Sequence, residues 1–170
     1  MTAYVVDTNV AIVANGEADK KGKLPDLRCQ TGCVAKLREV VDSGTVAIDD
    51  KYAILREYHK HLSARSGRSE EPKPGSVFFK SVLQSSCPVH CVSVGAGEDD
   101  SWGIDALRHS TFDRSDRKFL AVAVAVGGVV VNATDSDWRE HRSLMDGLGV
   151  EVQEVCPHLP WIDEAGRRST

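Results

Sequence analysis

The chain has 170 residues, 41% of them apolar and 27% charged, which is typical of one globular domain with a hydrophobic core. Its net charge of −4 excludes a global positive field, so contact with nucleic acid would need a local basic patch. No apolar run reaches the roughly 20 residues of a membrane helix, and the N-terminus lacks the charged and apolar regions of a secretory signal.

The first half of the chain alternates between short apolar runs and segments with helical spacing. The polar stretch at 66–76, rich in proline and glycine, indicates a loop, and so does the stretch at 95–103. In chain order we predict a strand at 3–7, a helix at 29–41, a strand at 45–48, a helix at 52–62, a short helix at 77–83 and a strand at 89–94.

The stretch FLAVAVAVGGVVVNATD is ambiguous, because alternating alanine and valine before Gly-Gly could form a hairpin. The alternative is a buried helix ending at Gly127 and a strand at 129–132. We favour the helix, since Asp113 can cap its start, alanine is the best helix former and Gly127 suits the left-handed C-terminal position. A last strand is predicted at 150–155. We expect one domain at 1–156 and an irregular tail at 157–170.

Strands that alternate with helices favour a mainly parallel sheet covered on both faces. Ligands of such sheets bind beyond the carboxyl ends of the strands. Acidic residues follow several of the predicted strands in this way: Asp7, Asp49, Asp50 and Asp135.

Four acidic positions are candidates for one site: Asp7, Glu57, Asp116 and Asp135, with Asp137 close to the last. Each also has an ordinary structural explanation, such as a helix cap or a solvated surface. If they gather, their mutual repulsion raises their pKa values, and a divalent cation removes the conflict. Sites made only of oxygen ligands suit hard ions such as Mg²⁺ or Mn²⁺, which support phosphodiester hydrolysis.

The motifs VVDTNV, ILREY, DRSDRKFLAVA and NATDSDW resemble, in order and spacing, the successive acidic motifs of PIN-domain nucleases. That family includes the toxin ribonucleases of bacterial toxin–antitoxin pairs. The resemblance spans roughly residues 3–155. It implies an α/β fold, a PIN-like three-layer α/β/α sandwich with a mainly parallel central sheet, and it favours the helix over the hairpin.

The resemblance also implies a site that holds Mg²⁺ or Mn²⁺. The family's four acids fall on Asp7, Glu57, Asp116 and Asp135. Asp7 and Asp116 would be direct ligands, Glu57 and Asp135 would complete the shell or orient water, and Asp137 is a further candidate ligand. The supporting positions are Asn9, Thr134 and Asp113, and Asp113 stays open as an alternative ligand to Asp116.

The activity implied is that of a metal-dependent endoribonuclease with RNA as substrate. We also expect an antitoxin or other regulatory partner and a homodimer. We do not expect the chain to associate with a membrane. Basic residues beside the acids could contact nucleic acid: Arg114, Arg117, Lys118 and Arg139. One alternative is a catalytically degenerate scaffold that binds RNA or protein. Another is an Mg²⁺-dependent phosphatase with an aspartate nucleophile, which would need an aspartate where Asn9 stands.

The five cysteines are odd in number and irregular in spacing, which argues against a disulfide framework and for the cytoplasm. Cys29-x₃-Cys33 and Cys87-x₃-Cys91 have spacings of the order seen in zinc sites. In an extended strand Cys87 and Cys91 would lie about 13 Å apart, too far to share an ion. Cys29 and Cys33 on a helix could share one, but small buried apolar side chains are the commoner use of cysteine, and we expect that use.

Overall fold

The computed structural model describes residues 1–18, 22, 24–62 and 71–159. Residues 66–70 of the predicted loop and 160–170 of the predicted tail lie outside the described residues. Among the described residues, no helix is both long and apolar enough to cross a membrane.

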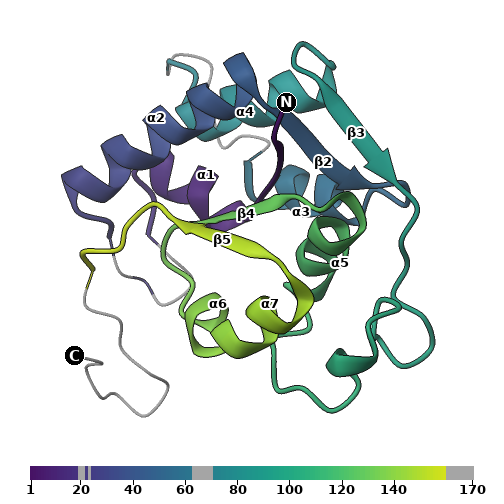
Figure 1. Ribbon diagram of the computed structural model, residues 1–170. Coiled ribbons are helices and arrows are strands. Elements are labelled where there is room, and N and C mark those ends of the chain that lie inside the picture. Colours follow the sequence, from purple (N-terminus) through teal and green to yellow (C-terminus); the bar gives the residue numbers. More distant parts are fainter. Residues whose placement is uncertain (19–21, 23, 63–70, 160–170) are drawn as a thin grey trace.

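A five-stranded sheet, parallel throughout, forms the centre of the fold, as the alternation of strands and helices predicts (Figure 1). The strand order is β3-β2-β1-β4-β5. Each strand lies within about two residues of its predicted position. The bounds are β1 Ala3–Val6, β2 Thr45–Asp49, β3 Val89–Val92, β4 Val129–Asn132 and β5 Glu151–Glu154.

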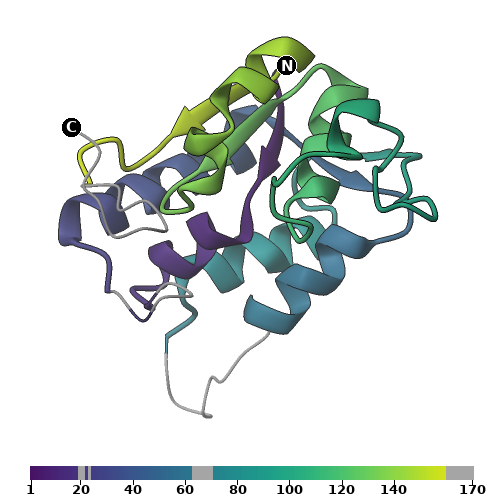
Figure 2. The ribbon, with the colours of Figure 1, turned by 90° about the horizontal axis from the view of Figure 1, so that it is seen from below.

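Helices cover both faces of this sheet, which confirms the predicted three-layer α/β/α architecture (Figures 1 and 2). Helices α1 to α4 lie on one face, and α5 to α7 lie on the other. This division follows from right-handed crossovers, because the chain moves from β1 towards β3 and then back across the sheet to β4 and β5. The bounds are α1 Thr8–Ala14, α2 Leu27–Ser43, α3 Ala53–Leu62, α4 Pro74–Leu83, α5 Arg117–Val126, α6 Asp137–Glu140 and α7 Arg142–Leu148.

The central strand is β1, which pairs with β2 on one side and with β4 on the other. Its residues Val5 and Val6 are fully buried, as expected of a strand that is covered on both faces. The ladder ends where the Asp7 backbone N–H donates to the Val131 carbonyl at 3.0 Å. The direction of strand order reverses between β1 and β4, and this is where sheets of this class bind ligands.

The ambiguous stretch is a helix followed by a strand. Helix α5 is buried from Arg117 to Ala123, and its C-cap is Gly127, whose φ of +57° is the left-handed conformation that glycine adopts without strain. The predicted cap was wrong: the residue at the N-cap position is Asp116, not Asp113. The prediction missed α1, α6 and α7, which are too short to show a clear period.

The polar stretch predicted as a loop at 66–76 ends earlier than expected, because α4 begins at Pro74. Proline is favoured at the first position of a helix, where its missing N–H is not needed. Gly75 follows, and a Cβ there would lie 2.3 Å from the Ala11 carbonyl oxygen of α1. Glycine is therefore required for α1 and α4 to pack this closely.

The cysteines differ from the sequence expectation, because Cys29 of α2 and Cys156 after β5 form a disulfide. The two residues are 127 positions apart in the sequence. Spacing along the chain could not reveal this pair, since only the fold brings the start of α2 to the end of β5. Cys33 and Cys87 are buried free thiols and Cys91 is exposed. Burial raises the pKa of Cys33 to about 12.

Candidate functional site

Three carboxylates meet at the carboxyl ends of β1 and β4. Asp7 follows β1, Asp135 lies in the loop after β4, and Asp116 stands at the start of α5. One carboxylate oxygen from each lies within 4.8 Å of the others. Asp7 and Asp116 are 4% and 1% exposed, and Asp135 is half-buried. The predicted gathering of these three acids is therefore what the fold produces.

The Asp7 carboxylate is held from two sides. Its Oδ1 accepts the Asn9 backbone N–H at 3.1 Å, and its Oδ2 accepts the Trp138 indole N–H at 2.7 Å. Burial, and next the charge of Asp135, raise the pKa of Asp7 to about 7, although both hydrogen bonds act in the opposite direction. The carboxylate is thus rigidly oriented but electrostatically uncompensated by the protein.

A divalent cation fits this group of side chains. The three donors are all carboxylate oxygens, which hard ions such as Mg²⁺ and Mn²⁺ prefer. A cation among them would remove the repulsion that raises the pKa of Asp7. Asp7, Asp116 and Asp135 could therefore hold a metal ion.

Glu57 lies beside these acids but has other partners. Its Oε1 accepts the Thr8 hydroxyl at 2.8 Å, and its Oε2 forms an ion pair with Lys118 at 2.6 Å. It is not one of the three acids whose oxygens come within 4.8 Å of each other. Glu57 lines the adjoining pocket, where it can contact water or substrate. Because Lys118 balances its charge, Glu57 does not need a metal ion to do so.

That pocket opens directly over Asp7 and Asp135. It is bordered by α1, α3 and the loop after β4, and Thr134 lies on its wall as well as Glu57. The lining residues are Asp7, Thr8, Asn9, Ile12, Val13, Glu57, His61, Thr134, Asp135 and Ser136.

Asn9 orders the loop that carries Asp135. Its amide oxygen accepts the backbone N–H groups of Ala133 and Thr134 at 2.9 and 3.4 Å, and its amide nitrogen donates to Asn132 Oδ1 at 3.0 Å. The buried Asn132 in turn accepts the Asp135 N–H at 3.2 Å and donates to the Asp135 carbonyl at 2.9 Å. The two asparagines therefore fix the path of the chain between β4 and Asp135.

The Asp137 carboxylate contacts Asp113 and His141, and it is not among the three acids whose oxygens gather. The Asp113 N–H donates to Asp137 Oδ2 at 2.7 Å, and Asp137 Oδ1 lies 3.1 Å from His141 Nδ1. Asp113 Oδ1 accepts the Ser115 N–H at 2.7 Å, which makes a local turn before α5. Of the two alternatives that the sequence left open, Asp116 is the one beside Asp7 and Asp135.

The basic residues divide into two pairs. Arg117 is buried and donates to the backbone carbonyls of Phe112, Asp100 and Ser110, while Lys118 is buried against Glu57. For these two the predicted contact with nucleic acid is corrected, because each side chain is used inside the protein. Arg114 and Arg139 are exposed, so for them the contact stays a prediction.

The sequence did not single out Trp138, Asn132 or Thr8 as site residues. Tryptophan and asparagine in these positions have many ordinary uses, and only the fold shows their bonds to the acids. The available signal was position, since Asn132 ends β4 and Trp138 comes three residues after Asp135.

Replacing Trp138 with Phe is expected to lower both stability and metal affinity. The change removes the hydrogen bond to Asp7 and leaves a gap beside Phe112, whose ring centroid lies 5.0 Å from that of Trp138. We expect a loss of about 2–4 kcal/mol in the free energy of unfolding. The affinity for a divalent cation should fall about 10–100-fold, as for other groups that orient a metal ligand. Denaturant unfolding and metal titration test this. Phe112→Leu is the control for lost packing, and an equal loss of metal affinity in that variant would remove the special role of the indole N–H.

Comparison with known proteins leaves the family open. No family model matches the sequence, and no curated protein matches it. One solved structure similar to this chain is described as VapBC2 from Rickettsia felis bound to a DNA fragment from their promoter. The match covers 89% of this chain and 98% of that chain, at 11% identity and a TM-score of 0.47. A likeness at this level carries no functional conclusion.

Proposed function

We propose that this chain is a metal-dependent endoribonuclease that uses Mg²⁺ or Mn²⁺ to hydrolyse RNA phosphodiester bonds. The observation that carries the proposal is the convergence of Asp7, Asp116 and Asp135, from three separate segments, at the ligand-binding edge of a parallel sheet. The acidic motifs that resemble those of PIN-domain nucleases supply these same residues.

The contacts support a role for each residue. Asp7, Asp116 and Asp135 would hold the cation, while Trp138 and Asn9 keep Asp7 and the Asp135 loop in place. Glu57, held by Thr8 and Lys118, faces the pocket as a hydrogen-bond acceptor for the attacking water. The cation would supply charge stabilisation at the phosphoryl oxygens and would lower the pKa of the attacking water.

Exposed Arg114 and Arg139 are proposed to contact the phosphates of the RNA, and Thr134 to hydrogen-bond substrate in the pocket. From the motif resemblance, a regulatory protein partner of the antitoxin kind and a homodimer also belong to this proposal. Co-expression with the product of a neighbouring small gene tests the partner, because an antitoxin should co-purify and suppress cleavage.

The experiment that tests the activity uses the full chain and an end-labelled RNA of mixed sequence. Internal cleavage is expected with Mg²⁺ or Mn²⁺ and not in excess chelator, and restored metal should restore it. The chelated sample is the control for contaminating metal-independent ribonucleases. If metal binds, as measured by titration calorimetry, but neither RNA nor DNA is cut, the chain is the degenerate scaffold instead.

The phosphatase alternative is disfavoured by Asn9. In that chemistry a second acid two residues after the nucleophile faces the substrate. Here the Asn9 side chain is turned to Asn132 and to the loop backbone. Both Asp7 oxygens also accept hydrogen bonds from the protein.

A further inference from the structure

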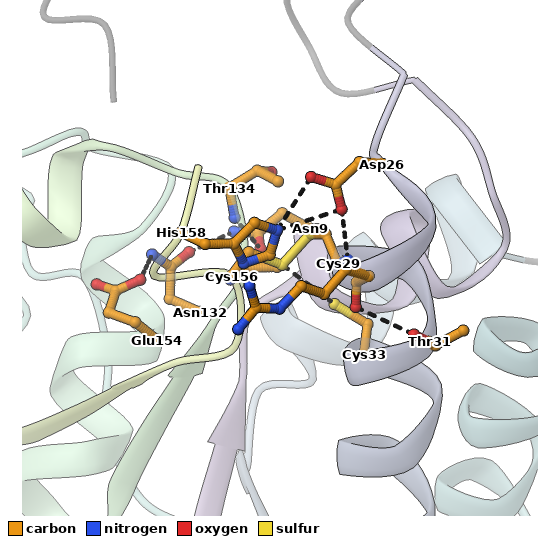
Figure 3. Close-up of a disulfide and its surroundings, with 12 residues drawn as sticks. Asn9, Asp26, Cys29, Thr31, Cys33, Asn132, Thr134, Glu154, Cys156 and His158 are labelled. Atoms are coloured by element: carbon orange, nitrogen blue, oxygen red, sulfur yellow. Dashed lines mark hydrogen bonds and ion pairs between the residues drawn. A yellow bond between two sulfur atoms is a disulfide. The ribbon is translucent and has the colours of Figure 1, made fainter. Parts of the chain in front are cut away.

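Three cysteine side chains form a second cluster, made of residues other than the acidic group. Cys29 and Cys33 occupy successive turns at the start of α2, and Cys156 follows β5 (Figure 3). All three are fully buried, and their sulfur atoms lie within 4.8 Å of one another. The proposed nuclease chemistry makes no use of them.

The disulfide between Cys29 and Cys156 accounts for only two of these sulfurs. The third, Cys33 Sγ, lies 4.0 Å from Cys156 Sγ. Two thiolates bound to one tetrahedral zinc ion lie about 3.8 Å apart, given Zn–S bonds of about 2.3 Å. The distance between Cys33 Sγ and Cys156 Sγ is therefore close to that between two thiolates bound to one zinc ion. The disulfide does not explain why a third sulfur lies here.

A histidine stands beside the cluster. His158 comes two residues after Cys156, in a turn closed by the Leu159 N–H on the Cys156 carbonyl at 3.2 Å. Its Nε2 donates to the carboxylate of Asp26 at 3.0 and 3.2 Å. The same carboxylate caps α2 and accepts the Cys29 backbone N–H at 2.7 Å. Asp26 thus joins the histidine to the cysteine-bearing turn of the helix (Figure 3).

The hydrogen bond from His158 to Asp26 is of the kind that metal-binding histidines make. A ligating imidazole almost always donates its second ring N–H to a carboxylate or carbonyl, which fixes the tautomer and orients the ring. With Nε2 donating to Asp26, the lone pair of His158 is on Nδ1. No hydrogen bond to Nδ1 forms among the described residues, so this atom is the candidate fourth donor. In the disulfide form it is not within 4.8 Å of all three sulfurs, and His158 would move closer when the reduced cysteines bind the ion.

We propose that Cys29, Cys33, Cys156 and His158 form a structural zinc site of the Cys₃His type. Sulfur and imidazole donors select Zn²⁺, whereas the all-oxygen group of Asp7 selects Mg²⁺ or Mn²⁺. The two clusters therefore take different metals. Cys29 and Cys33 thus bind metal, whereas the sequence predicts that they only pack, and the zinc site is independent of nuclease activity.

The disulfide and the zinc site are two states of the same sulfurs. Two equivalents of a monothiol of the glutathione class reduce the Cys29–Cys156 bond to two thiols and leave as their own disulfide. Cys29, Cys33 and Cys156 then each release one proton as Zn²⁺ binds, and neutral His158 contributes its Nδ1 lone pair. In a reducing compartment the zinc form is the one expected.

Cobalt substitution tests the site in the full chain. Protein reduced with a phosphine and freed of metal is titrated with Co²⁺. Thiolate-to-cobalt charge-transfer absorption and the strong visible bands of tetrahedral cobalt are expected at one equivalent. Zn²⁺ should then displace the colour. Because carboxylates give no such charge-transfer band, cobalt bound at Asp7 cannot imitate this result.

Matched variants assign the ligands. Cys33→Ser is expected to lose the charge-transfer band, whereas Cys87→Ser, which changes another buried thiol, should keep it. His158→Gln should shift the visible bands. Asp26→Asn keeps the helix cap, since asparagine caps as well as aspartate, and should weaken zinc binding about 10–100-fold.

Absence of a charge-transfer band in the reduced protein would overturn the proposal, and so would a band that Cys33→Ser leaves intact. A thiol count provides the second measurement, one that does not depend on variants folding. Protein isolated without reductant and then denatured in chelator should show five reactive thiols if zinc was bound. A count of three would mean that the disulfide is the native state and would also overturn the site.

Discussion

Replacing Asp135 with Asn is expected to abolish metal-dependent cleavage and, at the same time, to stabilise the metal-free protein at pH 8. The introduced amide would keep the acceptor oxygen that receives the Asp137 N–H at 3.0 Å, so the loop after β4 should retain its shape. The charge that the change removes is the one that, after burial, does most to raise the pKa of Asp7. Cleavage should fall by more than about 100-fold, beyond the effect of residues that only orient ligands.

The raised pKa of Asp7 makes the metal-free protein less stable as the pH rises. The pKa of Asp7 is about 7 in the folded chain and 3.8 for the ordinary side chain. Between these values the folded protein binds a proton that the unfolded chain has lost, so stability decreases as the pH rises. The free energy of unfolding of the metal-free protein should therefore fall from about pH 4 to pH 7 and stay low above it. In Asp135→Asn the fall should be smaller.

Urea unfolding in excess chelator at pH 5 and pH 8 measures this difference. Addition of Mg²⁺ should stabilise the original chain more at pH 8 than at pH 5, and should have little effect on Asp135→Asn. Asp146→Asn changes an exposed carboxylate on α7 and is the control. An Asp135→Asn protein that cleaves RNA normally, or whose stability has the original pH dependence, would refute the assignment of Asp135.

Replacing Lys118 with Met is expected to cost about 3–5 kcal/mol in the free energy of unfolding. Lys118 and Glu57 form a 2.6 Å ion pair between α5 and α3, with side chains only 11% and 15% exposed. Without the lysine, Glu57 would remain as a buried carboxylate near Asp7 with no cation to balance it. The cost arises from this unpaired charge more than from the lost attraction.

The double variant Lys118→Met with Glu57→Gln tests that explanation. With neither charge present, its stability should return to within about 1–2 kcal/mol of the original, which gives a large coupling energy in the double-mutant cycle. Lys73→Met is the control, because it breaks a comparable but exposed pair with Glu17 and should cost less than about 1 kcal/mol. Additive effects of the two central changes would contradict a coupled pair.

The sheet could be predicted because its strands have a simple physical signature. The strands that contain Val5, Val6 and Val130 have continuous runs of buried apolar residues. This pattern is expected of strands that are covered on both faces. Parallel strands also place their carboxyl ends at one edge. The meeting of Asp7 and Asp135 therefore followed from the order of elements alone.

The choice between Asp113 and Asp116 could not be predicted, because it depends on where α5 begins. Both acids precede the same helix, and a shift of one turn exchanges their positions. In the structure a turn closed by the Asp116 N–H on the Asp113 carbonyl directs Asp113 towards Ser115. That leaves Asp116 at the first turn, beside Asp7.

The burial of Arg117 and Lys118 also could not be predicted from the sequence. The run RSDRK has the composition of a solvated surface, and charged side chains are rarely buried unless they are paired. Lys118 has its partner on α3, 61 positions earlier in the chain, and Arg117 has its partners in the loop before α5. Such long-range pairs leave no periodic signal.

The strand order has a consequence for synthesis of the protein on the ribosome. Strand β1 is made first and lies at the centre of the sheet, yet its neighbour β4 emerges more than 120 residues later. Until then one edge of β1 is unpaired, and neither Asp116 nor Asp135 has been synthesised to join Asp7. A nascent or truncated chain that stops after β3 therefore carries one acid of three. The complete acidic group can assemble only when synthesis is almost finished.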